Sequence, residues 1–453
     1  MRNIAIIAVL MSLTLIAACS DKPETMNTMV KGTITVADSV DDSGDFSNIE
    51  VTIIKQDSVN AAIDTVFNSL TDINGSFSGT ANFPRKNFYP MLISRNDNDI
   101  ASLRVILAEN DTLTVNAELP EIRETISLES REHNAMEVFR RVDRSFQRVG
   151  AFINSGTLPD SQVVDEISKW TDLYWEVYQK HENTIASYMA AEKAAELVGV
   201  LDKTEMMAKI DEALPADYMV SVALNLGKPY VAEQEGFDAA SAYLDSLSEI
   251  SQSESAKEIV MRDKIRMYFD SSRVKDAKQL LSTYENEFSS PSSERWAKTI
   301  RYDLNYLAPG VEAPDFTFVT IEGDTVSKKS LDGSTYILEI SPLANYEYQD
   351  DYDRTLVIHE IYKNYGLKIF TIPLDQSEVT VNAFFEERRK AWPVAQLGSF
   401  DVQEIIKKFN VVQVPTRLLI DKNGELIRKY ERDEFDEVIQ GLNRALRNSN
   451  SPS

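Results

Sequence analysis

The sequence contains almost no cysteine. Cys19 is the only cysteine among 453 residues, so the chain can form no internal disulfide and its folded parts must be stabilised by packing. For the same reason, no pair of thiols is available within one chain for dithiol redox chemistry.

Histidine and basic residues are also scarce. The three histidines (His133, His181 and His359) lie in distant segments without the spacing of metal ligands. The 47 basic residues are outnumbered by 72 acidic ones, giving a formal charge of −25, which argues against binding to nucleic acid. We find no Gly-rich phosphate loop and no nucleophile elbow. We therefore expect no metal and no cofactor.

The N-terminus contains one run of apolar residues. Ile4–Ile16 is almost uninterrupted, but a membrane span needs about 20 residues, so this run is typical of an export signal. The following residues, Ile16-Ala17-Ala18-Cys19, resemble the bacterial lipobox. That resemblance implies a signal peptide over 1–18, a lipid on Cys19 and a tether over 19–27.

This interpretation predicts a location for the protein. Two or three acyl chains anchor a protein stably where one would not, so we expect a lipid-anchored protein of the cell envelope, with the membrane and its face left open. The alternative is an ordinary secretory signal in which Cys19 is incidental.

Residues 28–122 are predicted to form a β-sandwich. Short segments with alternating apolar residues are separated by turn-forming Asp, Asn and Gly, and no helical pattern lies between them. The stretch Thr71–Phe77 resembles a hairpin of carboxypeptidase-regulatory-like modules in lipoproteins of Bacteroidota type. The predicted strands are Val30–Val36, Glu50–Ile54, Ile63–Phe67, Phe88–Ile93 and Leu113–Ala117.

Residues 130–306 are predicted to form a helical domain. Two apolar stripes have helical spacing, and we expect them to form core rather than a ligand site. The stripes are Ala135, Val138, Phe139, Val142 and Phe146, and then Trp170, Leu173, Tyr174 and Val177.

Residues 309–447 alternate strand and helix patterns. The buried strand Tyr336–Ile340 is followed by a helix and a second strand, Leu367–Pro373. Arg417–Ile420 and Glu425–Tyr430 are joined by Asp421-Lys422-Asn423-Gly424, a strong hairpin turn. This order predicts a three-layer α/β domain. The fold class is therefore multidomain α+β, with a sandwich, a helical domain and an α/β domain in that order.

Two motifs in this last region carry a family resemblance. Pro309–Phe316 resembles the G-x-x-A-P-D-F opening of thioredoxin-like proteins of the TlpA and peroxiredoxin type. Val411–Gly424 resembles the V-x-x-x-P-T-x-x-L-I-D-x-x-G stretch of the same group. The resemblance implies a thioredoxin-like fold over 309–447, with Pro415 as the cis-proline that faces the active site.

Active relatives carry C-x-x-C at a helix N-terminus, where the helix dipole lowers the pKa of the first thiol. The resemblance places Asn345 and Tyr348 at these two positions. Neither residue can exchange with a disulfide, so we expect no catalytic residue and no redox activity. The nearby acidic residues Glu347, Asp350, Asp351 and Asp353 are expected to form a solvated helix start, because their spacing does not fit an EF-hand loop.

These observations favour a non-enzymatic binding or scaffolding protein. A loop beside a cis-proline leaves backbone groups free to pair with an extended chain, so an extended peptide or an envelope protein is the expected partner. Two alternatives remain: a thiol-disulfide oxidoreductase or peroxiredoxin-like protein, by resemblance alone, and an accessory subunit of an outer-membrane assembly. The candidate binding surface consists of Tyr346, Tyr348, Trp392, Val414 and Pro415.

Overall fold

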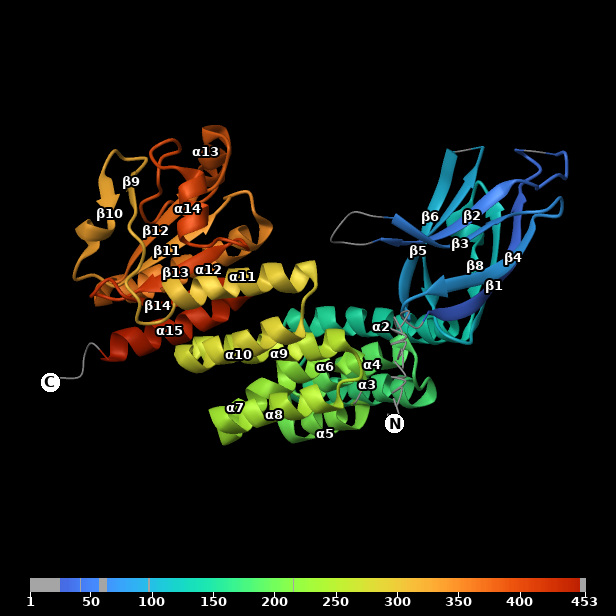
Figure 1. Ribbon diagram of the computed structural model, residues 1–453, viewed down its shortest axis with the longest axis horizontal. Helices are drawn as coiled ribbons and strands as arrows, with labels where there is room; N and C mark the ends of the chain where they lie inside the picture. The colour runs from blue at the N-terminus through green and yellow to red at the C-terminus, as the bar shows by residue number, and fades with distance from the viewer. Residues whose placement is uncertain (1–24, 41, 57–62, 97, 215, 449–453) are drawn as a thin grey trace, which may run out of the picture. The chain divides into compact units, whose positions relative to one another are not determined.

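The computed structural model describes residues 25–448 except 41, 57–62, 97 and 215 (Figure 1). Cys19 and the signal expected at 1–18 lie outside the described residues. The chain divides into two compact units, Met1–Val222 and Ala223–Ser453. The domain limits expected from the sequence remain predictions.

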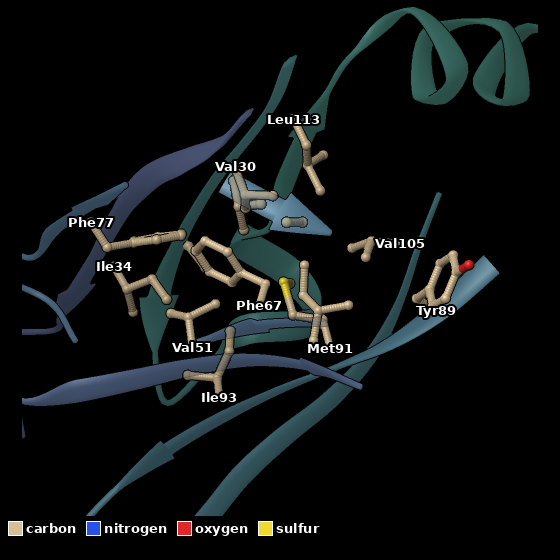
Figure 2. Packing of buried hydrophobic residues seen from close by; sticks show 14 of the residues in the cluster. Val30, Ile34, Val51, Phe67, Phe77, Tyr89, Met91, Ile93, Val105 and Leu113 are labelled. Atoms are coloured by element: carbon tan, nitrogen blue, oxygen red, sulfur yellow. The ribbon is translucent and has the colours of Figure 1, made fainter. Parts of the chain in front are cut away.

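The first unit begins with the predicted β-sandwich. Two four-stranded sheets have the orders β4-β1-β7-β8 and β3-β2-β5-β6. Side chains that alternate along these strands fill the space between the sheets, as Figure 2 shows for Ile34, Val51 and Phe67. Phe67 and Phe77 meet there with ring centroids 6.3 Å apart. The strands are β1 (Met26–Val36), β2 (Ile49–Gln56), β3 (Ile63–Leu70), β4 (Ser76–Phe83), β5 (Asn87–Arg95), β6 (Asn98–Leu107), β7 (Thr112–Leu119) and β8 (Ser127–Glu129).

Helices complete the first unit. Both predicted stripes face the core: Ala135, Phe139 and Tyr174 are buried, and Phe146 packs edge-on against Tyr174 at 5.9 Å. The expectation that they form core is confirmed. The helices are α1 (Ile122–Thr125), α2 (Arg131–Asn154), α3 (Asp160–Lys180), α4 (Ile185–Val198), α5 (Lys203–Ala213) and α6 (Asp217–Val222).

The start of α2 joins the sandwich to these helices. Buried Glu132 forms an ion pair with Lys86 at 3.2 Å and accepts the backbone N–H of Ile185 at 2.9 Å. His133 accepts the N–H of Ile106, at the end of β6, through Nε2 at 3.2 Å. Its Nδ1 lies 2.9 Å from the hydroxyl of Ser130, the N-cap of α2. Burial lowers the pKa of His133 to about 4, so this imidazole is neutral near pH 7.

The second unit starts with a π-helical turn and five helices. A buried ion pair between Lys429 and Asp303, at 3.1 Å, holds the last of these helices to the domain that follows. The elements are the π-helix Ala223–Gly227, α7 (Lys228–Glu235), α8 (Phe237–Ile250), α9 (Glu254–Asp270), α10 (Val274–Glu287) and α11 (Pro291–Tyr306).

The C-terminal domain is built on a mixed sheet of order β12-β11-β13-β14. β11 pairs parallel with β12 and antiparallel with β13, which pairs antiparallel with β14. Alternate residues of β11 join two separate hydrophobic clusters: Leu338 and Ile340 belong to one, and Ile337 to the other. The sheet is therefore covered on both faces, and the predicted three-layer α/β architecture is confirmed.

The strands of this domain are β9 (Thr317–Val319), β10 (Thr325–Ser327), β11 (Tyr336–Ser341), β12 (Lys368–Pro373), β13 (Thr416–Ile420) and β14 (Leu426–Glu431). Its α-helices are α12 (Tyr346–Tyr362), α13 (Glu378–Glu386), α14 (Val402–Lys408) and α15 (Phe435–Asn448). Short 3₁₀ turns lie at Lys328–Leu331, Lys363–Tyr365 and Arg432–Glu434.

Candidate functional site

The candidate site lies where β11 ends and α12 begins. Asn345 is the N-cap of α12, and its Oδ1 accepts the backbone N–H of Tyr348 at 2.9 Å. The third amide N–H of a helix, when it donates to the N-cap position, would stabilise a thiolate there. In this protein it donates to the side-chain oxygen of Asn345, which has no redox chemistry.

The loop between β11 and α12 is held in place by hydrogen bonds. The Leu343 N–H donates to Asp375 Oδ2 at 2.7 Å, and the side-chain amide of Gln349 donates to the Leu343 carbonyl at 3.1 Å. The Leu374 N–H donates to the Ser341 carbonyl at 3.1 Å. Leu343 itself is fully buried. This loop is therefore packed shut.

Tyr348, at the second expected cysteine position, lies inside the protein. Its side chain is 1 % exposed, and its hydroxyl donates to Glu339 Oε2 at 3.1 Å. The same hydroxyl lies 3.1 Å from Thr371 Oγ1. Burial raises the pKa of Tyr348 well above its ordinary value, so this phenol remains protonated and acts as a donor.

The buried carboxylate of Glu339 is balanced by an arginine. Glu339 is 0 % exposed in the middle of β11, and its Oε1 accepts Arg417 Nε at 3.1 Å. The guanidinium also lies 3.0 Å from Asp351 Oδ2 and packs on the ring of Phe435 at 4.6 Å. Burial raises the pKa of Asp351, although Arg417 acts in the opposite direction. A buried charge that is paired and hydrogen-bonded in this way is a structural feature rather than a reactive one.

Trp392 closes the same cluster. Its indole N–H donates to Thr371 Oγ1 at 2.8 Å, and its ring packs 5.0 Å from that of Tyr352. Trp392 is 5 % exposed, and Tyr348 and Pro415 are buried as well. The expectation that these three residues line a binding surface is therefore wrong. The polar partners of Tyr348 and Trp392 lie inside the domain, which allows these two side chains to be buried.

The other side of the site is open. The Val414–Pro415 peptide bond is cis, the conformation that the resemblance implies. The Pro415 carbonyl accepts the N–H of Arg432 at 2.9 Å, whereas the half-buried Val414 has no backbone hydrogen bond to any other described residue. Val412, two residues earlier, is 56 % exposed.

Tyr346 belongs to this open side. It is 73 % exposed on the first turn of α12. The next residue, Glu347, forms an ion pair with Arg432, and the backbone N–H of Arg432 donates to the Pro415 carbonyl. Arg432 thus ties the first turn of α12 to the segment around Val414. Of the predicted surface, Tyr346 and Val414 remain accessible.

The acidic helix start is only partly solvated. Asp350 and Asp353 are exposed, as expected. Asp351 is 8 % exposed because it faces Arg417, so the expectation is wrong for this residue. No group of three or more His, Cys, Asp or Glu side chains among the described residues is placed to hold a metal ion.

Glu339, Arg417 and Thr371 were not among the expected site residues. A signal was present, because Glu339 is a single acidic residue inside an otherwise buried strand, and Arg417 follows Pro415 by two positions. A lone charge at such a position requires a partner. The sequence does not show which of the chain's 47 basic residues supplies it.

Comparisons with known proteins find relatives for part of the chain. No family model matches the chain. The thiol-disulfide oxidoreductase ResA of Bacillus thuringiensis subsp. konkukian is 26% identical over 132 residues, which span 29% of this chain and 74% of that protein. ResA of a Bacillus cereus strain is 27% identical over 140 residues, spanning 31% of this chain and 79% of that protein. The C-terminal region is a thioredoxin-like domain of the TlpA/ResA type.

Similar solved structures cover the same share of the chain. The thioredoxin domain of a thiol-disulfide oxidoreductase from Bacteroides vulgatus is 21% identical and covers 30% of this chain and 97% of its own, with a TM-score of 0.28. A thioredoxin family thiol:disulfide interchange protein from Chlorobium tepidum TLS is 20% identical, with coverage of 30% and 97% and a TM-score of 0.27.

The cysteine content of this chain limits the chemistry of the domain. The chain has a single cysteine, Cys19, at the opposite end of the sequence, so the domain holds no C-x-x-C. The single cysteine argues against redox activity. Across the described residues, no helix has the length and apolar character needed to cross a membrane.

Proposed function

We propose that this protein is an exported lipoprotein whose redox-inactive thioredoxin-like domain binds an extended segment of a peptide or another protein. The observation that carries the proposal is the contrast at the site. The thiol positions are closed by Asn345 and Tyr348, while the backbone N–H and carbonyl of Val414 have no partner among the described residues. An extended chain can pair with such free backbone groups as an added strand.

Tyr346 supplies the side-chain contact in this proposal. An exposed tyrosine offers a large apolar area and a polar tip with little loss of conformational entropy, so tyrosines are frequent among the residues that dominate binding. Its position beside Glu347, which Arg432 ties to the Pro415 segment, places it on the side of the site where the free backbone lies.

A random peptide library tests the binding function. The chain from residue 20 to 453, which contains every described residue, is immobilised and used to select peptides. Peptides that bind wild type should bind Tyr346→Ala about tenfold more weakly, because central aromatic residues contribute about 1 kcal/mol or more. The matched control is Tyr365→Ala, a 63 % exposed tyrosine just beyond the far end of α12. Equal loss in both variants, or no enriched peptide, would contradict the proposal.

The lipid anchor needs a separate test. The lipobox at Ile16–Cys19 supports diacylglycerol attachment at Cys19 and a location in the cell envelope. Cells fed an alkyne-labelled fatty acid should label the wild-type chain and leave Cys19→Ser unlabelled. A labelled Cys19→Ser variant would exclude this anchor and leave the binding proposal intact.

A further inference from the structure

The C-terminal domain has a second candidate site, a pocket of about 230 Å³ beside the first half of α13. It is formed by three segments: the turn after β9, the stretch before Gly398, and α13. Its residue Val381 also belongs to the hydrophobic cluster that contains Tyr348. The lining residues are Ile321, Glu378, Val381, Asn382, Ala395, Gln396 and Leu397.

Backbone hydrogen bonds fix the walls of this pocket. The Ile321 N–H donates to the Val394 carbonyl at 2.9 Å, and the Gln396 N–H donates to the Val319 carbonyl at 2.8 Å. Val381 is 3 % exposed and belongs to the hydrophobic cluster under α13. Because backbone hydrogen bonds and a packed helix fix its walls, the pocket is preformed and needs little rearrangement to receive a ligand.

The lining has a specific chemical character. Ile321, Val381 and Leu397 give an aliphatic wall. Glu378, Asn382 and Gln396 bring a carboxylate and two amides, whose side chains have no hydrogen-bond or ion-pair partner among the described residues. All three can accept hydrogen bonds, and a carboxylate can only accept. The complementary ligand is therefore a cationic donor at the end of an apolar stem.

The surrounding charges favour a cation as well. Three basic residues follow α13, and two of them are held by other carboxylates: Lys390 pairs with Glu322, and Arg389 with Glu360 at 3.0 Å. The third, Arg388, packs over the ring of Phe384 at 4.7 Å. Glu378 is left without such a partner in the described part of the chain. The formal charge of −25 raises the local concentration of basic partners around the whole protein.

The size of the pocket selects the kind of ligand. Pockets for cofactors and drug-sized molecules usually measure about 300–1,000 Å³, so 230 Å³ suits one side chain. We propose that this pocket receives a basic side chain, best an arginine, from the peptide or protein that the domain binds. Arginine matches because its planar guanidinium offers five donors to the carboxylate and the two amides. This inference rests on the proposed binding function.

Small amino-acid probes test the pocket without any knowledge of the partner. N-acetyl-arginine N-methylamide is titrated into the chain from residue 20 to 453 while the methyl resonances of Ile321, Val381 and Leu397 are followed by NMR. The neutral isostere N-acetyl-citrulline N-methylamide is the matched probe. The arginine probe should shift these methyls at millimolar concentration, and the citrulline probe should bind about fivefold more weakly.

Two variants on α13 give the control in the protein. Glu378→Gln should weaken the arginine probe about fivefold and abolish the preference over citrulline. Glu386→Gln, an exposed change at the other end of α13, should leave both probes unchanged. Equal binding of the two probes by wild type, or equal effects of the two variants, would overturn the inference.

The peptide library separates this inference from the proposed function. Peptides selected by wild type should carry arginine or lysine at one position, and this preference should disappear with Glu378→Gln. Selected peptides without a preference for arginine or lysine would contradict the inferred role of the pocket but not the proposed peptide binding. A library that yields no peptide would overturn peptide binding, and the amino-acid probes would still decide whether the pocket prefers a cation.

Discussion

The two sides of the expected thiol site differ in how their polar groups are hydrogen-bonded. On the side of β11 and α12, Glu339 and Tyr348 are buried and hydrogen-bonded. On the side of the 411–415 segment, Val414 keeps a backbone N–H and a carbonyl without partners among the described residues. Buried polar groups are costly unless paired, whereas half-exposed ones can be solvated or can pair with a ligand. The difference indicates that the β11–α12 side is structural, whereas the 411–415 side has the unpaired backbone groups that the proposed binding requires.

The largest loss of stability should come from removing the buried ion pair on the side of β11 and α12. Arg417→Met leaves the fully buried Glu339 without its cation, and loss of one partner of a buried pair costs about 3–5 kcal/mol. Native-state hydrogen exchange of the β11 amides should report this loss of opening free energy. The double variant Glu339→Gln/Arg417→Met should recover part of it. A change below about 1 kcal/mol in the single variant would show that the pair does not hold the site closed.

In the first unit, lowering the pH should destabilise the fold around the buried His133. His133 has a pKa of about 4 in the folded protein and about 6.5 when unfolded. The unfolded chain therefore takes up the proton first as the pH falls. The contribution of His133 is fully present above pH 6.5 and is lost between about pH 6.5 and 4, by about 3 kcal/mol.

Hydrogen exchange at β6 and α2, measured between pH 7 and 4, checks this loss. His133→Gln keeps an acceptor for the Ile106 N–H and should remove this part of the pH dependence. An unchanged pH profile in the variant would mean that His133 is not the group that titrates.

A smaller effect is expected from a single hydroxyl on the closed side. Tyr348→Phe removes one donor to Glu339 but keeps the ring in place. A lost hydrogen bond to a charged group costs about 1.5–3 kcal/mol. The opening free energy measured from exchange of the β11 amides should fall by this amount. Binding of library-selected peptides should stay within about twofold of wild type. If peptide binding fell tenfold with little loss of stability, Tyr348 would belong to the binding edge.

The smallest effect on stability should come from the open side. Tyr346 and Val412 are 73 % and 56 % exposed, so Tyr346→Ala and Val412→Ser should change the free energy of unfolding by no more than about 0.5 kcal/mol. A thermal melt checks this. A large destabilisation by either variant would mean that these side chains pack in the folded protein and are not free for a partner.

The sequence predicted the architecture better than the site. Alternation and turn residues located five of the eight sandwich strands, but β4, β6 and the three-residue β8 were not expected. β4 carries Ser, Gly, Thr and Asn between its three buried residues, and β6 starts with polar, exposed residues at a sheet edge. Both patterns give a weak apolar signal, because pairing with neighbours rather than local propensity makes them strands.

The sequence indicated which segments form the candidate site but not which of its side chains are buried. Local motifs led to Asn345 at the helix start and to a cis-proline at Pro415, since both depend on short-range sequence. The burial of Tyr348 and Trp392 depends on Glu339 and Thr371, which lie on different strands. A partner 9 or 21 residues away in the sequence is set by the tertiary fold, so a tyrosine that fills the core cannot be told from one that meets a ligand.

Residue-resolved hydrogen exchange at α12 and the 411–415 segment tests the central claim most directly. The Tyr348 amide, bonded to Asn345 Oδ1 at 2.9 Å, should exchange slowly with and without a library-selected peptide. The Val414 amide should exchange quickly in the free chain and at least tenfold more slowly with the peptide bound. A Val414 amide that is already slow in the free chain, or that a bound peptide leaves fast, would contradict the account.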